Sequence, residues 1–425
     1  MNDSALRAAL ERAVKAQLIH RIERLYTFAH ALIPFTLREN IGGLRRQRMH
    51  AQVAKVLEVQ QPEDVEALAY HFVAAGVRAK AVEYSRQSAA RAERLYAYPS
   101  AIRHLQVALE MLEAREDALS HIALLENLAD LHHVINENVR AIPIYLEALQ
   151  LWRGLPNADR WVAVRLQRKI GDAATVMNRF TDYQRFAPTS RSSLEAGLLQ
   201  AQDQPPHPET IRLLCALSRD AWYIASSADW DKAERYARAA VKMGEELDAP
   251  EELSLALDAL SPVYGARGLY RERLEVCQKR LGVSRDARVA GYRSRILIHY
   301  ELGRALSAVG EYEAALVQAM EAEALSAAIL DVSSQVMAMN LQSQCLYPLD
   351  RWDDLLALDE KVQEIRARNP LERMGGALCF HTALVSSVKS LRGDRERANE
   401  LREEAYGIMT TIGGPPEQWV RNQRF

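Results

Sequence analysis

The chain has 425 residues, 48% of them hydrophobic, and is long enough to bury a large core. Lysine and arginine number 54 against 56 for aspartate and glutamate, a balance that argues against a nucleic-acid-binding or membrane-surface protein. The four cysteines include no close pair for zinc or redox chemistry, and we find no signal peptide and no apolar stretch long enough to span a membrane. We therefore expect a cytoplasmic protein without metal or cofactor that does not bind nucleic acid by this chain alone.

Glycine and proline are sparse and no strand pattern recurs, which indicates an almost all-helical protein. Residues 1–60 are the exception. A short helix over residues 4–16 precedes the segment LIHRIERLYTFAH, Leu18 to His30, whose alternation of apolar and polar residues predicts a small β-hairpin. Two helices follow, separated by Gly42 and Gly43. Together these elements predict part of a winged-helix domain over residues 1–60.

This N-terminal stretch resembles the segment that follows the nucleotide-binding core in signal-transduction ATPases with numerous domains. That group includes the large LuxR-type and maltose-regulator-like regulators and the adenylate-cyclase-associated predicted ATPases. The resemblance is carried by Tyr26, Phe28, His30, Leu32, Arg45, Arg46, His50, Val53, Leu57, Ala69, His71, Phe72, Gly76, Lys80 and Ala81. It implies a C-terminal arm of such a protein, with a nucleotide-binding ATPase domain or a regulator as the protein partner.

The chain departs from that family at the nucleotide site. It contains no GxxxxGK[ST] motif, whose backbone N–H groups and lysine would hold the phosphates, so we expect no ATP binding by that route. Residues 1–60 carry ten basic against five acidic side chains, and this excess could contact phosphates. The resemblance implies instead that Arg45 and Arg46 pair with a partner domain, and we favour that interpretation.

Residues 292–331 contain the clearest copy of a repeating unit. Apolar and small residues recur every three or four positions on both sides of Gly310, which predicts two amphipathic helices folded back on each other. Gly303, Ala315 and Ala322 are small where two helices would cross closely, and Tyr312 supplies apolar filling. In residue type and spacing this unit resembles the tetratricopeptide repeat.

About eight such hairpins are predicted from about residue 78 onward. The residue equivalent to Ala315 falls at Ala101, Ala141, Phe186, Ala233, Arg273, Ala315, Leu355 and Ala398, at intervals of 40 to 47 residues. The small or aromatic packing residues of the second and fourth copies are Ala129, Ala141, Ala148, Trp230, Ala233 and Ala240. The interval exceeds the 34 residues of the standard repeat, so longer helices or links are expected.

The fold prediction is an all-α, right-handed α-solenoid of tetratricopeptide-like hairpins over residues 61–412, with the partial winged-helix segment before it and a tail over residues 413–425. Each hairpin has an apolar stripe that only stacking on its neighbours can bury. The polar, proline-rich segment over residues 200–209 is interpreted as a link between two hairpins in preference to a domain hinge.

We expect no enzymatic activity. The eleven histidines form no HExxH motif, no Gly-x-Ser-x-Gly turn occurs, and the carboxylates are interpreted as solvated helix faces. Two function classes remain. The first is a scaffold or sensor arm whose inner groove takes up a protein segment in signal transduction, and the second is a sensor that holds a small-molecule effector in the same groove. Tyr223, Tyr264 and Tyr300 are the predicted groove residues.

Overall fold

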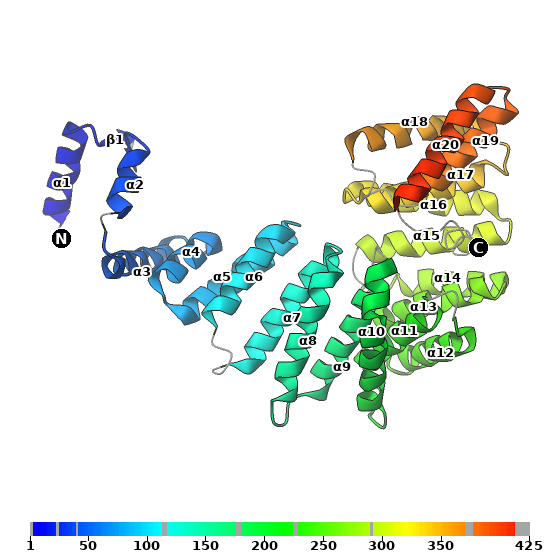
Figure 1. The fold of residues 1–425 in the computed structure, drawn as a ribbon, viewed down its shortest axis with the longest axis horizontal. Coiled ribbons are helices and arrows are strands. Elements are labelled where there is room, and N and C mark those ends of the chain that lie inside the picture. Colours follow the sequence, from blue (N-terminus) through cyan, green and yellow to red (C-terminus); the bar gives the residue numbers. More distant parts are fainter. Residues whose placement is uncertain are drawn as a thin grey trace. The chain divides into compact units, whose positions relative to one another are not determined.

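The computed structural model of the chain describes residues 3–22, 25–39, 41–112, 117–175, 180–223, 228–289, 292–369 and 377–412. These residues form twenty α-helices and one two-stranded β-hairpin, coloured along the sequence from blue α1 to red α20 (Figure 1). The all-helical fold class is confirmed. The chain forms two compact units, Met1–Ile135 and Asn136–Phe425. The predicted tail over residues 413–425 lies outside the described residues.

The first unit begins with the mixed segment expected from the sequence. Its elements are α1 (Asp3–Lys15), β1 (Ile19–Ile22), β2 (Leu25–Phe28), α2 (Leu32–Glu39) and α3 (Gly43–Gln60). The two strands pair antiparallel, with Ile19 opposite Phe28 and Ile22 opposite Leu25, which confirms the predicted hairpin. Phe28 and Leu25 are nevertheless exposed. This hairpin therefore contributes little to the core of the unit.

The remaining helices of the first unit are α4 (Val65–Ala75), α5 (Arg78–Arg94), α6 (Tyr98–Met111) and α7 (Ala118–Val134). Helix α4 begins with the side chain of Asp64 accepting a hydrogen bond from the N–H of Ala67 and ends at Gly76 in the left-handed conformation. Its buried face packs Phe72 against Tyr84 of α5, with ring centroids 5.4 Å apart and the rings stacked. This aromatic pair anchors the α4–α5 contact.

The second unit consists of helices throughout its described part. Its elements are α8 (Asn138–Arg153), α9 (Arg160–Thr175), α10 (Phe180–Ala201), α11 (Pro208–Tyr223), α12 (Trp230–Glu246), α13 (Pro250–Ala266), α14 (Tyr270–Val283), α15 (Tyr292–Ala308), α16 (Tyr312–Ala328), α17 (Val332–Leu346), α18 (Trp352–Arg368), α19 (Ala377–Leu391) and α20 (Arg395–Ile412). From α9 onward, consecutive helices pair as hairpins, and the first helix of one hairpin also packs on the first helix of another, as α9 does on α11 and α11 on α13.

The predicted repeat register agrees with the burial of its anchor positions. All eight anchors have 8% or less of their surface exposed: Ala101, Ala141, Phe186, Ala233, Arg273, Ala315, Leu355 and Ala398. Six of these residues are alanine or leucine, as a close helix crossing requires. Arg273 is the unexpected member, since it is a charged side chain in a position where Ala233 and Ala315 occupy the neighbouring hairpins.

In the fourth and sixth hairpins a small residue on the first helix faces the anchor. At Gly303, an added Cβ would lie 3.2 Å from the carbonyl oxygen of Ala315 and 2.9 Å from the side chain of Leu341, so a larger residue would push α15 away from both neighbours. In the fourth hairpin the equivalent residue is Ser218, whose hydroxyl donates a hydrogen bond of 2.9 Å to the carbonyl of Ala233. Serine within these first helices thus combines small size with a partner for its hydroxyl.

The turn between α15 and α16 also agrees with the sequence. Gly310 has a φ of +87°, which glycine adopts without strain, and the chain reverses there. The remaining predicted packing residues in this part of the array are Ala315 and Ala322, both fully buried, and Tyr312, which is half-buried against the same core.

Candidate functional site

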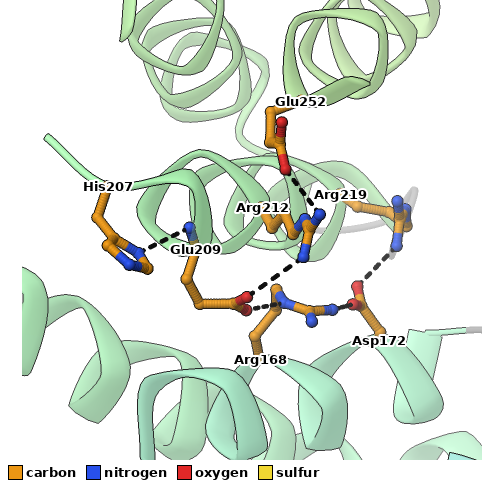
Figure 2. A network of polar contacts seen from close by, with 7 residues as sticks. All are labelled: Arg168, Asp172, His207, Glu209, Arg212, Arg219 and Glu252. Carbon is orange, nitrogen blue, oxygen red and sulfur yellow. Dashed lines mark hydrogen bonds and ion pairs between the residues drawn. The ribbon is translucent and has the colours of Figure 1, made fainter. Parts of the chain in front are cut away.

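Six charged side chains form a continuous line across α9, α11 and α13 (Figure 2). We call them the polar row: Glu252, Arg212, Glu209, Arg168, Asp172 and Arg219. Positive and negative groups alternate along it. The row lies wholly within the second unit and ties three first helices to one another.

Arg168 lies at the centre of the polar row. Its Nε lies 2.5 Å from Glu209 Oε1, and its Nη1 lies 2.7 Å from Asp172 Oδ2. Burial lowers the pKa of the Arg168 guanidinium, but Asp172 and Glu209 together raise it above the ordinary value for arginine. Arg168 therefore stays charged while it bridges α9 and α11, with only 13% of its side chain exposed.

The other two arginines of the row are more accessible than Arg168. Arg212 Nη2 lies 2.6 Å from Glu252 Oε1 of α13 and its Nη1 lies 3.7 Å from Glu209 Oε2. At the other end, Arg219 Nη1 lies 2.9 Å from Asp172 Oδ1. About a third of the side chain of each of these two arginines is exposed, 33% for Arg212 and 36% for Arg219. A guanidinium group that is held at one nitrogen and otherwise partly exposed, as that of Arg219 is, can bind an anionic group of a ligand.

Helix spacing explains why these side chains meet. Arg168 and Asp172 are four residues apart on α9, and Arg212 and Arg219 are seven apart on α11, so each pair shares one helix face. Glu209 lies in the first turn of α11, where the helix dipole favours a carboxylate.

The start of α11 is fixed by the preceding histidine. The Nδ1 of His207 accepts a hydrogen bond of 3.1 Å from the N–H of Glu209, and Pro208 occupies the first helical position (Figure 2). The ring of His207 also stacks on Trp161 of α9, with centroids 3.8 Å apart. The proline-rich segment predicted as a link therefore caps α11 and holds Glu209 in place.

A second group of charges lies between α13, α14 and α15. We call it the buried cluster: Asp258, Arg273, Arg280, Glu301 and Arg304. Arg280 pairs with Asp258, while Glu301 binds both Arg273 Nη2 at 2.8 Å and Arg304 Nη1 at 3.2 Å. Burial raises the pKa of Asp258 above its ordinary value, although Arg280 opposes the shift. Burial acts on Glu301 in the same direction, but Arg304 and Arg273 outweigh it and hold the pKa of Glu301 below its ordinary value.

Arg273 occupies the anchor position at which the neighbouring hairpins have Ala233 and Ala315, and its longer side chain fills more space there. Its guanidinium lies against Gly265 of α13, where an added Cβ would be 3.2 Å from Nη1. Its Nε donates a hydrogen bond of 3.3 Å to Ser261 Oγ, and its Nη2 binds Glu301. Gly265, Ser261 and Glu301 thus form a matched set for one buried arginine.

The predicted groove residues have different environments. Tyr264 is buried against Ala237 of α12 and Leu260 of its own helix, so it is not part of an accessible lining. Tyr300 is half-buried, with the Arg304 guanidinium 5.8 Å from its ring centroid. The side chain of Tyr223 lies outside the described residues.

Arg45 and Arg46 are exposed on α3 in the first unit. The repeat-packing residues of the other hairpins behave as expected of a core: Ala129, Ala141, Ala148, Ala233, Ala240 and Ala398 are buried. Trp230 is half-buried and stacks on Trp222 with ring centroids 6.0 Å apart. It therefore packs across the junction of α11 and α12.

One buried triplet has the composition of a hydrolase triad. His381 Nδ1 lies 2.7 Å from Ser343 Oγ, and His381 Nε2 lies 3.0 Å from Asp359 Oδ1. Ser343 is fully buried and its hydroxyl also donates to the carbonyl of Met339 within α17. A nucleophile must be reachable by its substrate, so this triplet is a packing contact between α17, α18 and α19. Among the described residues, no group of three or more potential metal ligands occurs.

The polar row was missed because sequence reasoning interpreted carboxylates as solvated faces. The signal available was the i, i+4 pair Arg168 and Asp172 and the i, i+7 pair Arg212 and Arg219, each on a helix whose other side is apolar. The partners across helices could not be recognised from spacing along one helix. None of the helices in the described ranges is long and apolar enough to cross a membrane.

Solved structures of other proteins share the fold of this chain. No protein-family model and no curated protein sequence matches the chain. Over 93% of its length, its structure is similar, with a TM-score of 0.51 and 14% identity, to a signal-transduction ATPase with numerous domains from Pyrococcus horikoshii that has a tetratricopeptide repeat sensor. The chain spans 57% of the length of that protein.

Two further solved structures match over most of both chains. The apo form of the quorum sensor NprR from B. thuringiensis has a TM-score of 0.51 and 12% identity, covering 86% of this chain and 99% of NprR. The Rap conjugation gene regulator of plasmid pLS20, in complex with the Phr* peptide, has a TM-score of 0.50 and 13% identity, covering 84% of this chain and 96% of that one. At such identities the likeness shows the fold alone, which is a tetratricopeptide-like array of helical hairpins.

Proposed function

We propose that this chain is a non-enzymatic scaffold or sensor arm in signal transduction, which binds an extended peptide or protein segment along the first helices of its second unit. The observation that carries the proposal is the polar row. Packed first helices present partly exposed guanidinium groups there, and ion pairs to α9 and α13 fix their positions. Pre-positioned polar groups reduce the ordering cost of binding a flexible peptide.

The structural relatives support a peptide ligand. The pLS20 Rap regulator was solved with a peptide, and NprR is a quorum sensor, and both share the fold over most of this chain. An array of stacked hairpins offers a long row of first helices, which is suited to a ligand in extended form.

The experiment is selection from an unbiased peptide display library by the full chain, followed by anisotropy measurements on synthetic copies of enriched peptides. Enriched sequences whose binding weakens on the change Arg219→Gln would support the proposal. Binding that is unaffected by Arg219→Gln and by Arg212→Gln would place the ligand elsewhere, and a library without enrichment would contradict peptide binding.

We propose further that the chain works as the arm of a signal-transduction ATPase or regulator, with residues 1–60 as a partial winged-helix segment. Arg45 and Arg46 are exposed on α3 and available for a partner domain. Isothermal titration of the chain with ATP should give no binding heat, because the chain has no GxxxxGK[ST] phosphate loop. Charge reversal at Arg45 and Arg46 should weaken capture of a separately expressed nucleotide-binding domain. Micromolar ATP binding, or capture that survives the reversal, would contradict this assignment.

A small-molecule effector is the second candidate, and one cavity favours it. A hollow of about 510 Å³ lies where α14 ends beside α15 and α16, lined in part by Leu281, Asp286, Arg295, Ile298 and His299. Ligand pockets commonly have volumes of roughly 300–1,000 Å³ with a few polar groups. Thermal-shift measurements with nucleotides, sugars and amino acids, repeated on His299→Phe, test it. A stabilisation that disappears in His299→Phe would support an effector site.

A further inference from the structure

The buried cluster carries one more positive than negative group. Its three guanidinium groups, from Arg273, Arg280 and Arg304, face two carboxylates, from Asp258 and Glu301. Arg304 is 29% exposed at the side chain, against 2% for Arg273 and 5% for Arg280, and Asp258, the partner of Arg280, is 36% exposed. Arg304 is therefore the guanidinium group of the cluster that a ligand can reach.

Arg304 is held in place without being neutralised. Its Nη1 binds Glu301, but the same carboxylate also binds the buried Arg273 at the shorter distance of 2.8 Å. The ring of Tyr300 lies under the guanidinium and keeps it oriented. A partly exposed arginine whose counter-ion is shared with a buried arginine is well suited to accept a second carboxylate from a ligand.

Arg219 has the same arrangement two hairpins earlier. Its counter-ion Asp172 is shared with Arg168, which lies at the shorter distance of 2.7 Å, and Arg219 is the more exposed of the two arginines, 36% against 13% at the side chain. The two exposed arginines also occupy equivalent repeat positions. Arg219 follows Ser218, which binds the anchor of its hairpin, and Arg304 follows Gly303, which meets the anchor of its own.

From this geometry we infer that the peptide recognised by the second unit is acidic, and that two of its carboxylates pair with Arg219 and Arg304. The inference rests on the proposed peptide-binding function. Helices α11 and α15 belong to hairpins that are not neighbours: α11 packs on α13, and α13 is connected to α15 through α14. Two helix spacings of about 8–10 Å give a separation on the order of 16–20 Å. An extended chain advances about 3.3 Å per residue, so the two acidic residues of the ligand lie about five to six positions apart.

The test uses the full chain and fluorescein-labelled synthetic peptides with a Thr-Val background. One series carries two glutamates separated by two, four, six or eight positions, and matched series carry two lysines or two glutamines. We expect the glutamate peptide with six positions of separation to bind at least about tenfold more tightly than the lysine peptides. We also expect it to bind more tightly than the glutamate peptide with a separation of two.

The changes Arg219→Gln and Arg304→Gln should each weaken binding of the glutamate peptide about tenfold and leave the glutamine peptide unaffected. Folding should persist, because Asp172 keeps Arg168 and Glu301 keeps Arg273 as partners. Arg304→Lys, which retains the charge, should lose less than Arg304→Gln. The matched control is Arg140→Gln on α8, an exposed arginine whose Nη1 likewise binds a single carboxylate.

Three results would overturn the inference. Glutamate and lysine peptides could bind equally, the arginine changes could weaken glutamate and glutamine peptides alike, or Arg140→Gln could match Arg304→Gln. If library peptides bind the chain with no preference for acidic residues, the ligand class is wrong while peptide binding stands. If no peptide of any kind binds, both the proposed function and this inference fail.

Discussion

Replacing Arg273 by alanine tests whether a buried arginine has taken over the packing role that alanine has in neighbouring hairpins. Arg273 is 2% exposed and contacts two neighbouring helices, through Gly265 and Ser261 on α13 and Glu301 on α15. The change Arg273→Ala removes two hydrogen bonds and leaves a cavity facing Gly265. We expect a loss of about 3 kcal/mol in the free energy of unfolding, at the low end of the range for breaking a buried ion pair.

The low end applies because Glu301 keeps a partner. After the change, Arg304 Nη1 still lies 3.2 Å from the carboxylate, so no buried charge is left without a counter-ion. Arg273→Met keeps most of the volume and loses only the polar contacts, so it should cost about 1 kcal/mol. The predicted order of stability is therefore wild type, Arg273→Met, then Arg273→Ala.

A change at Gly265 tests the same contact from the side of α13. Alanine favours a helix over glycine by up to about 1 kcal/mol, but in the wild type its Cβ would be 3.2 Å from Arg273 Nη1. The change Gly265→Ala should therefore be neutral or destabilising in the wild type and stabilising in Arg273→Ala. Urea denaturation of the four proteins gives the coupling energy. Additive effects, or an Arg273→Ala midpoint equal to that of the wild type, would refute the idea that this guanidinium fills the space beside Gly265.

Three further changes test the packing and the polar contacts. Ala315→Phe should lower the free energy of unfolding by about 1 to 3 kcal/mol through overpacking, and an unchanged urea midpoint would contradict the repeat register. His207→Ala should cost about 1 to 2 kcal/mol, because the N–H of Glu209 loses its acceptor, and hydrogen exchange at the start of α11 measures this. His71, whose Nδ1 lies 2.9 Å from that of His50, has its pKa lowered by burial and by His50, so the folded state resists its protonation. The contribution of neutral His71 to stability should be complete above about pH 6.5, the ordinary pKa of histidine, and should be lost below it. Urea midpoints measured over a pH series test this. A loss of stability with falling pH that is as steep in His71→Gln as in the wild type would contradict it.

The repeat register could be predicted because it depends on small residues at regular intervals along one chain. Ala315 and Gly303 signal a close helix crossing by their size alone, and both lie at such a crossing. The β-hairpin near the N-terminus was predictable for a similar reason, since alternation along four residues is a local property. Arg273 was placed at an anchor position by its spacing, but nothing on α14 itself indicates that Gly265 makes room for it.

The polar row and the buried cluster could not be predicted, because their members come from three helices each. Arg168 meets Glu209 across 41 residues of sequence, and the pairing depends on how α9 and α11 are rotated about their axes. The same limit explains the misplacement of Tyr264. Aromatic residues on first helices were assumed to face inward, and the rotation of α13 instead buries this ring against Ala237 of α12.

The free-energy cost of burying the charges of the polar row and the buried cluster bears on their role. Buried ion pairs stabilise a fold little more than well-packed apolar residues would, since desolvation offsets most of the attraction. Asp172 and Glu301 each bind two arginines, of which Arg219 and Arg304 are the more exposed. Part of the desolvation cost therefore serves to fix Arg219 and Arg304 where solvent reaches them. If the clusters served packing alone, replacing either exposed arginine by methionine should leave stability unchanged and have no effect on ligand binding. Retained stability with lost binding is the combination that distinguishes a recognition surface from a structural one.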